Sequence, residues 1–573
     1  MTLPLPDKKL LGLLTLMLWS VLAVQAQGWD WATSTTRLNS ATVSITQVVA
    51  DAQGNSYVTG SFQDIVNFGT HRLTASQPSS GFQANPDLFV AKLTASGQWD
   101  WAVQAGGANG QAKGIGLALD ASGQNLYVTG TAVGTTNFGT IALPPYPGAN
   151  NGFVARLGSG GQWQWVVRTG NCGRPVLDGA GSIYVAGAFA GSTLTFGATT
   201  LTAPVNNSNI FVAWLSPAGQ WLGAVSGGGT GFEEATSLAV DSNGNAYASG
   251  RFSNSGGTTT QFGAFTLTPF SSGNSDGFVA KLDSTRQWQW AVRGGPFYLG
   301  GESPKVSVTP NGRLLAWAGT VTEGSFGPYT LSHTLTMHSG AAIACLNRRG
   351  TWQWVAASTS TTNGTARTVD VGADSQGNWY ATGTASNGNK FGQYPLTGTI
   401  SDQAWVARLN GSTGAWQWVL GAGGLGSSLV TGVSVAGTYL YVGGSFNQSP
   451  TFGAFSLSTN NYFGSEGFVA RIGSPLLATR PLTETAALAL YPIPCPAGHF
   501  TLEVPAHFTT SPTLDVTISN TLGQPVDKAP RLALATDGSL RVAVTASALP
   551  AGVYVLRVQA ADGSAATHRL VVE

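Results

Sequence analysis

The sequence has little charge, few histidines and few cysteines. Asp, Glu, Lys and Arg make up only 9% of the 573 residues, and the net charge is +1. A nucleic-acid-binding protein needs a clustered basic surface, so this composition argues against a nucleic-acid partner. The 6 His and 3 Cys form no HExxH, CxxC or other metal-ligand phrase. We therefore expect no metal and no cofactor, three unpaired thiols, and stability that comes from packing.

Long apolar runs are also rare, and the one near the N-terminus has the pattern of an export signal. Lys8 and Lys9 precede an apolar stretch over 10–24, and Val24-Gln25-Ala26 is a small-residue cleavage site. An uncleaved anchor is the alternative. No later segment is apolar enough to cross a bilayer. Residues 1–26 are thus predicted to be a signal peptide, and the mature protein to be extracellular or on the outer cell surface.

Aromatic residues and glycine are abundant, and they recur in order. The first Trp of a Trp-x-Trp phrase returns every 58 to 70 residues, at Trp29, Trp99, Trp163, Trp221, Trp288, Trp352 and Trp416. A YVTG-like phrase, a Phe-Gly pair and an FVAKL-like phrase keep the same order between them. Four markers repeated seven times indicate a repeat architecture.

Each repeat predicts four antiparallel strands. In the second, Gly114–Asp120 and Asn125–Thr131 form one hairpin, and Phe153–Leu157 and Gln162–Val167 form another. Turns of the DSNGN type join the first two strands. We read them as type I turns with a bulge rather than as calcium loops, which need a run of oxygen ligands. One such sheet cannot bury both of its faces, but seven in a ring can, so residues 27–474 are predicted to form a seven-bladed β-propeller.

The last repeat lacks its Trp-x-Trp strand, and a spare copy stands at Trp29-Asp30-Trp31. We expect the N-terminal strand to complete the last blade and close the ring. Spacing by two predicts that both Trp of a phrase point to one side of the strand, where they either pack between blades or present a sugar-stacking surface. Recurrence in nearly every repeat favours packing.

Two phrases carry a family resemblance. GFVAKLDSTRQWQWAV (277–292) and LAVDSNGNAYASG (238–250) resemble the bacterial SBBP-type β-propeller repeat, over roughly residues 28–473. The Tyr of the second strand is lost in Ala316-Trp317-Ala318-Gly319, and the Asp turn is lost at Gly437-Thr438. The resemblance implies a fold and no shared chemistry.

After a linker at 475–489, residues 490–573 form a separate module with at least five expected strands, typical of a small Ig-like β-sandwich. Its phrases YPIPCPAGHFTLEV (491–504), LPAGVYVLRV (549–558) and HRLVVE (568–573) resemble the C-terminal sorting domain of the type IX secretion system of Bacteroidetes-type bacteria. Ile493 stands where that family usually has Asn. The resemblance implies that the type IX machinery is the partner of this module. A β-sandwich used for binding is the alternative.

No catalytic constellation is evident. Glu233-Glu234 is the most tempting pair, because glycosidases use two carboxylates, but adjacent residues diverge. A second set of charged residues is expected in loops that ring one mouth of the propeller channel: Lys113, Arg174, Glu233, Glu302 and Arg367. His333 and His338 are expected to be loop residues without a metal.

These features favour a secreted, non-enzymatic propeller that binds a glycan or protein ligand, expected as a monomer. The alternative is an extracellular polysaccharide hydrolase or lyase with its site at the loop-rich mouth. A quinone-dependent dehydrogenase is a third hypothesis, which the seven-fold count and the missing ligand cluster disfavour.

Overall fold

The computed structural model divides the chain into two compact units, Met1–Pro475 and Leu476–Glu573, which are described separately. The structure describes the following residues of the first unit: 28–38, 42–77, 85–108, 110–146, 150–191, 193–203, 208–253, 259–270, 275–297, 303–309, 312, 314–321, 324–331, 339–360, 364–396, 402–459 and 464–473. In the second unit it describes 489–491, 499–503, 513–520, 525–528, 532–533, 541–545, 549–550, 552–560 and 565–572. The signal segment 1–26 lies outside these ranges. Within them every regular element is a strand, and no helix is long and apolar enough to cross a membrane.

The first repeat shows the common plan. An inner strand β3 (Val43–Ala50) pairs with β4 (Ser56–Phe62), which pairs with β7 (Asp87–Leu93), which pairs with the outer strand β8 (Trp99–Gly106), all antiparallel. Between β4 and β7 lies a short hairpin, β5 (Ile65–Phe68) and β6 (His71–Thr74), which holds the Phe-Gly pair. In the second repeat the four predicted strands are present as β9 (Gln111–Leu119), β10 (Asn125–Val133), β13 (Gly152–Gly158) and β14 (Trp163–Thr169).

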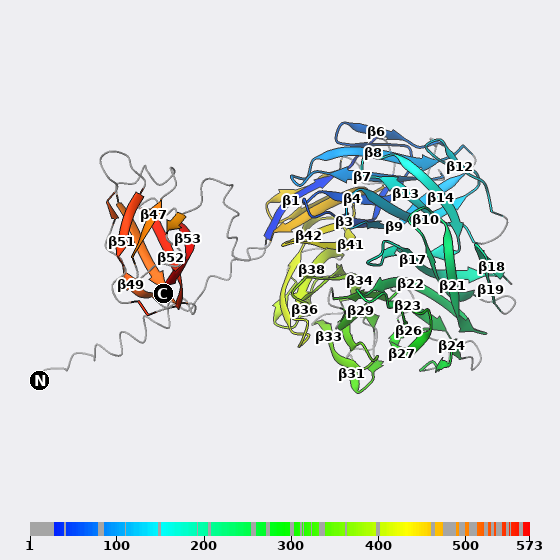
Figure 1. Cartoon of the computed structure of the whole chain (residues 1–573). Coiled ribbons are helices and arrows are strands. Elements are labelled where there is room, and N and C mark those ends of the chain that lie inside the picture. Colours follow the sequence, from blue (N-terminus) through cyan, green and yellow to red (C-terminus); the bar gives the residue numbers. More distant parts are fainter. Residues whose placement is uncertain are drawn as a thin grey trace, which may run out of the picture. The chain divides into compact units, whose positions relative to one another are not determined.

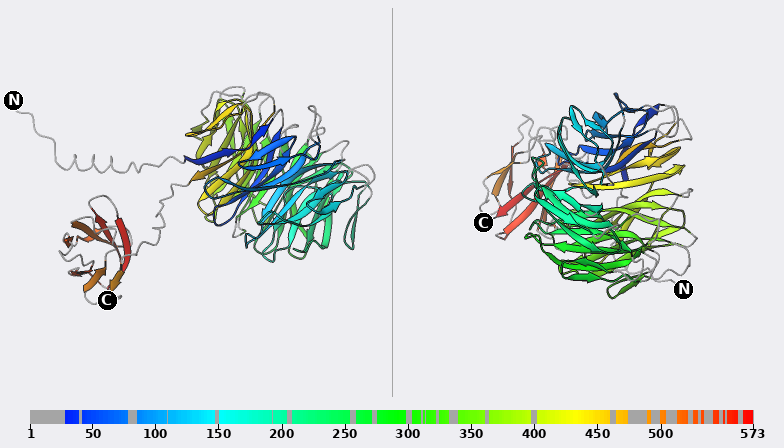
Figure 2. Two further views of the ribbon diagram at one scale, coloured as in Figure 1. Left: turned by 90° about the horizontal axis from the view of Figure 1, so that it is seen from above. Right: turned by 90° about the vertical axis from the view of Figure 1, so that its right-hand side faces the viewer.

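The other repeats follow this order. Their inner strands are β15 (Asn171–Cys172) with β16 (Val176–Leu177), β22 (Phe232–Val240), β28 (Lys305–Val308), β34 (Ala366–Ala373) and β41 (Ser428–Ala436). Their second strands are β17 (Ile183–Ala190), β23 (Ala246–Ser253), β29 (Leu314–Val321), β35 (Trp379–Ala385) and β42 (Tyr439–Phe446). Their third strands are β20 (Ser208–Leu215), β26 (Ser275–Leu282), β32 (Gly340–Asn347), β38 (Gln403–Leu409) and β45 (Glu466–Gly473). Their outer strands are β21 (Trp221–Gly229), β27 (Trp288–Phe297), β33 (Trp352–Ser360) and β39 (Trp416–Gly421), and β45 takes its outer partner from the N-terminus. In Figure 1 the inner strands β3, β9, β22, β34 and β41 surround the middle of this unit, and Figure 2 shows its sheets from two other sides.

The pairing expected between the N-terminal strand and the last repeat is present. Strand β1 (Gly28–Ser34) pairs antiparallel with β45, from Gly28 opposite Gly473 to Ser34 opposite Phe468. The sheet order β1-β45-β42-β41 therefore joins the first described residues to the last ones of this unit. Glu466 adds to the link, because its carboxylate accepts hydrogen bonds from the Thr35 hydroxyl (2.9 Å) and the Arg37 backbone N–H (3.1 Å).

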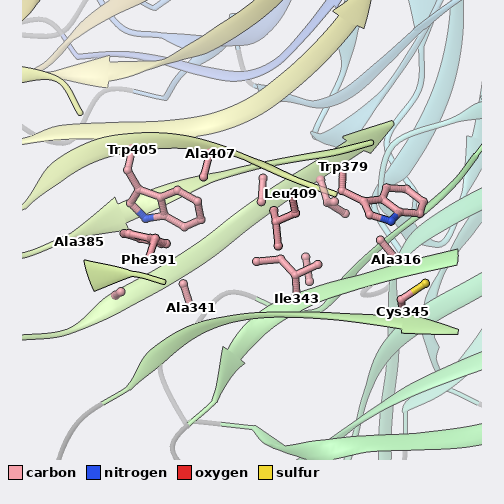
Figure 3. Close-up of a cluster of buried hydrophobic side chains, with 14 of the residues drawn as sticks. Ala316, Ala341, Ile343, Cys345, Trp379, Ala385, Phe391, Trp405, Ala407 and Leu409 are labelled. Carbon is pink, nitrogen blue, oxygen red and sulfur yellow. The ribbon is translucent and has the colours of Figure 1, made fainter. Parts of the chain in front are cut away.

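The hydrophobic core lies between neighbouring repeats. One cluster joins Ala316, Ala341 and Ile343 of the fifth repeat to Trp379 and Trp405 of the sixth (Figure 3). Another joins residues of the first repeat to Trp31, Tyr441 and Val469 of the last. Each sheet thus buries its faces against its neighbours, as the repeat argument requires.

The Trp residues are packing residues, and they reach both neighbours. The first Trp of each phrase meets the Phe of its own repeat edge-to-face, with ring centroids 4.7 to 5.1 Å apart. Trp99 Nε1 donates to the Ser34 carbonyl of the preceding sheet, and Trp101 Nε1 donates to the Ser159 carbonyl of the following one.

The expectation that both Trp point to one side of the strand is therefore wrong. The register shifts between the first and third residues of every phrase. In the first repeat, Trp99 faces Leu93 and Trp101 faces Lys92, so Asp100 is a bulged residue. A bulge breaks the alternation of side chains and turns the second Trp to the other face.

The Asp turns are also as expected. Gly54 N–H donates to the Asp51 carbonyl (3.1 Å), and Gly54 has a φ of 85°. The Asp51 carboxylate accepts from the backbone N–H groups of Gln53 and Asn55. The carboxylate stabilises the turn itself, and Asp120, Asp178, Asp241 and Asp374 do the same in other repeats.

The second unit contains the five strands expected from the sequence. They are β47 (His499–Glu503), β48 (Thr513–Ser519), β51 (Arg541–Thr545), β52 (Gly552–Ala560) and β53 (Ala565–Val572), with β46 (Ala489–Tyr491), β49 (Pro525–Lys528) and β50 (Leu532–Ala533) in addition. They form one sheet of order β46-β47-β51 and a second of order β49-β48-β52-β53, with β50 on β48. Ile518, Leu556 and Leu570 are fully buried in the second sheet.

Candidate functional site

The inner strands of the first unit surround two cavities. The larger has a volume of about 440 Å³, and all seven repeats contribute to it. Its lining comes from residues 47–50, 117–119, 174–177, 238–240, 306–308, 371–373 and 433–435. Most of these residues are Val, Leu and Ala, and we call it the apolar cavity for that reason, although nearly half of its surface is polar. It extends to Ala50, Leu119 and Val240, the last inner-strand residues before the Asp turns.

The smaller cavity, of about 340 Å³, lies toward the beginning of the inner strands. It is lined by Thr46, Ile115, Lys305, Arg367, Val369, Thr384, Leu429, Val430 and Thr431. Two of these side chains are cationic, and none is acidic, so we call it the cationic cavity. Thr46, Ile115, Val369 and Thr431 are the bulged residues of their inner strands, since the register shifts around each of them. The bulges turn these side chains into the space between the strands.

Two threonines of this cavity also link neighbouring repeats. Thr431 Oγ1 donates to the Ile45 carbonyl (2.6 Å), and Thr46 Oγ1 donates to the Gly114 carbonyl (2.9 Å). The bulges therefore fix the spacing of adjacent inner strands as well as the cavity wall.

An ion pair lies between the two cavities. Arg174 Nη2 donates to Asp370 Oδ1, which joins the third repeat to the sixth across the middle of the unit. Arg174 and Asp370 lie one residue after the position at which the inner strands have their bulges. Arg174 and Val371 line the apolar cavity. The Asp370 carboxylate also accepts from the backbone N–H groups of Val371 (2.8 Å) and Val433 (2.9 Å). Arg174 is thus part of the inner wall and not, as expected from the sequence, a loop residue at the mouth.

Lys113 and Arg367 occupy equivalent positions, near the start of β9 and β34. Lys113 pairs with Thr131, and Arg367 pairs with Thr384. Both Thr directly follow the Gly that recurs in the second strand of each repeat. Both side chains are exposed. Arg367 lines the cationic cavity together with Lys305, which the sequence reasoning missed; Lys113 lies two residues before the lining residue Ile115.

Glu233 does not belong to this site, and its expected place at the mouth is wrong. It is fully buried in β22, where Oε1 accepts from Thr260 Oγ1 (3.0 Å). Burial raises the pKa of Glu233, while the hydrogen bonds from Thr260 and from the backbone of Gly229 and Gly231 oppose that shift. The Oε2 atom has no hydrogen-bond partner in the described part of the chain. Its neighbour Glu234 forms an ion pair with Arg251 (2.9 Å), so the two carboxylates have separate environments.

Glu302, His333, His338 and Cys495 lie outside the described residues. Among the described residues no group of three or more His, Cys, Asp or Glu side chains could hold a metal ion. Cys172 and Cys345 are buried and form no disulfide.

The sequence did contain signals for the residues that were missed. At the position after the bulge other repeats have Gln47, Gly116, Ser237 or Gly432, so the charges of Arg174 and Asp370 are departures from the repeat. Lys305 lies opposite Ala318, which is the pairing level that follows the bulge in other repeats, so its charge is a third departure at the same position. An alignment of the inner strands that allowed for the bulge would have revealed these departures.

Comparison with known proteins identifies no family for this chain. No family model and no curated protein matches it. Among solved structures, a protein of unknown function from Dyadobacter fermentans is 12% identical, with a TM-score of 0.35, over 78% of this chain and 100% of that one. The extracellular region of plexin A4 (domains 1 to 8) is 9% identical, with a TM-score of 0.26, over 92% of this chain and 66% of that one. A eukaryotic initiation factor is 8% identical, with a TM-score of 0.25, over 66% of this chain and 87% of that one.

Proposed function

We propose that the first unit is a seven-bladed β-propeller that acts as a secreted or cell-surface binding scaffold without enzymatic activity. Support for the blade count comes from the seven inner-strand segments that line one cavity, and from the pairing of β1 with β45. Closure of this kind protects the sheet edges and holds the inner strands at fixed positions. Fixed inner strands suit a preformed binding site.

The cationic cavity is the proposed ligand site, and its charge is the observation that carries the proposal. Lys305 and Arg367 line it, and the exposed Lys113 lies two residues before its lining residue Ile115. Glu233, one of the two acids expected at this mouth, is buried in β22 and does not line this cavity. Guanidinium and ammonium groups bind carboxylate and sulfate oxygens through charge-assisted hydrogen bonds. The ligand class is therefore anionic.

An acidic glycan fits this site better than a folded protein does. A volume of 340 Å³ is at the small end of ligand pockets and admits about one or two sugar rings. Threonine hydroxyls and the apolar side chains of Leu429 and Ile115 complete the lining, as expected for a ring with both polar and apolar faces. We propose a uronic-acid-containing or sulfated glycan.

Binding of the full mature chain to an array of neutral and acidic glycans tests this proposal. Arg367→Gln is expected to weaken binding to acidic glycans about tenfold, the loss of one charged hydrogen bond. Lys92→Gln is the matched control, because Lys92 forms an ion pair with Asp100 on the outer strand, away from the cavity. Equal binding of neutral and acidic glycans, or no effect of Arg367→Gln, would contradict the proposal.

We further propose that residues 490–573 direct export through a type IX secretion system, on the sorting-domain resemblance of their motifs. The described strands of the second unit form a small two-sheet module, which suits such a role. A chain that lacks 490–573 should remain in the periplasm of a type IX-competent host, whereas the full chain should reach the outer surface or the medium. Unchanged export of the shortened chain would refute this assignment.

A further inference from the structure

The apolar cavity has a feature that the proposed glycan site does not use: a guanidinium at the base of an apolar wall. Arg174 is the only charged residue among the described ones that line it, and its side chain is 20% exposed. The partner Asp370 is only 1% exposed and does not line the cavity. The cavity therefore presents the guanidinium and not the carboxylate.

The chain is shaped to hold Arg174 in this place. A Cβ on Gly116 would lie 2.2 Å from the Arg174 Cα, so the second repeat needs a glycine where Arg174 approaches it. The carboxylate of Asp370 is fixed by two backbone N–H groups, which in turn fixes the guanidinium. A guanidinium has five N–H donors, and only Nη2 is engaged by a described residue.

We propose that the apolar cavity is a second ligand site and that it binds a small aliphatic carboxylate. The aliphatic chain would lie against the Val, Leu and Ala walls, and the carboxylate would accept hydrogen bonds from the N–H groups of Arg174 that Asp370 does not engage. The volume of 440 Å³ lies within the range of small-molecule pockets. The two cavities have no described lining residue in common, so this site can be tested separately from the glycan site.

Calorimetric titration of the full mature chain with decanoate and with uncharged decanol tests the proposal. Decanoate should bind at one site per chain. Arg174→Gln should weaken decanoate binding about tenfold and leave decanol binding unchanged, since only the carboxylate uses the guanidinium. Arg174→Gln leaves Asp370 without its partner, so Arg174→Gln/Asp370→Asn is the second variant, and it should show the same loss.

Two further variants separate this site from the glycan site. Ser307→Phe places a ring on the wall of the apolar cavity, and it should abolish the binding of both probes. Arg367→Gln changes only the cationic cavity and should leave decanoate binding as in the wild type. Absence of decanoate binding, or unchanged binding in Ser307→Phe, would overturn the proposal. Equal effects on decanoate and decanol in the Arg174 variants would overturn the role of Arg174.

Discussion

Closure by the N-terminal strand can be tested with a pair of matched substitutions, Trp31→Ala and Trp290→Ala. Trp31 belongs to the closing strand, and Trp290 belongs to an internal outer strand. Their surroundings correspond: Trp31 Nε1 donates to the Ala95 carbonyl and Trp290 Nε1 to the Arg348 carbonyl. The rings lie 6.2 Å from Tyr441 and 6.1 Å from Tyr247. Each also covers a glycine of the next repeat.

Truncation of a buried Trp to Ala costs about 3–5 kcal/mol. Trp31 is only 9% exposed, and the Arg471 guanidinium lies 5.7 Å from the centre of its ring, a cation–π contact worth about 0.5–1 kcal/mol. Trp290 is only partly buried. A domain of roughly 450 residues has an unfolding entropy of about 0.9 kcal/mol/K, so 4 kcal/mol lowers Tm by about 4 °C. Trp31→Ala should therefore lose several degrees in a calorimetric scan of the full mature chain, and Trp290→Ala should lose less.

The comparison between the two variants is decisive. A chain whose N-terminal strand is not docked in solution would lose stability in Trp290→Ala and none in Trp31→Ala. Deletion of 27–36 should cost more than Trp31→Ala, because it removes the whole pairing with β45 and the Thr35 hydroxyl bound to Glu466. An unchanged Tm for that deletion would refute closure.

Three further predictions concern buried groups. Burial raises the pKa of Glu233, so its contribution to stability is full below the ordinary carboxyl pKa and is lost as pH rises through its folded-state pKa. Glu233→Gln should therefore raise Tm at pH 8 by about 1–3 °C and leave Tm unchanged near pH 4.5. An equal change of Tm at both pH values would argue against a raised pKa. Gly414 and Gly123 both have a φ near +70°, but a Cβ at 414 would lie 2.5 Å from the Trp354 ring, whereas one at 123 would meet nothing within 4 Å. In chemical unfolding, Gly414→Ala should therefore lose about 1–3 kcal/mol more of the free energy of unfolding than Gly123→Ala. Equal losses would show that the Trp354 contact is not tight. Cys172 is buried, which raises its pKa to about 12; in a Cys495→Ser background it should react with iodoacetamide only in denaturant, and rapid labelling of the native protein would contradict its burial.

Much of the fold could be predicted from local patterns. Period-2 alternation and the Asp-Gly turns gave the strands of each repeat, because a strand and its turn depend mainly on residues close in sequence. The spare Trp29-Asp30-Trp31 phrase predicted a long-range pairing, since a repeat that lacks one strand needs a copy from elsewhere. These predictions depend on the counting of repeated units, which requires no knowledge of side-chain surroundings.

The candidate site could be predicted only in part. Arg367 and Lys113 are exposed near the start of the inner strands, close to where the repeat boundaries suggested. Glu233 was misplaced, because a charged residue next to glycines reads as a loop, whereas here burial against Thr260 holds it inside the sheet. Arg174 and Asp370 are 196 residues apart, and no local pattern connects them.

The sequence by itself determined that this chain is a β-strand repeat whose N-terminal strand pairs with its last repeat. The tertiary structure decided which face each Trp occupies, which carboxylates are buried, and which charges meet across the middle of the first unit. The physical reason is that one bulged residue reverses the direction of every side chain after it. The consequences of such a bulge for packing and for the cavities depend on neighbours that only the assembled sheets bring together.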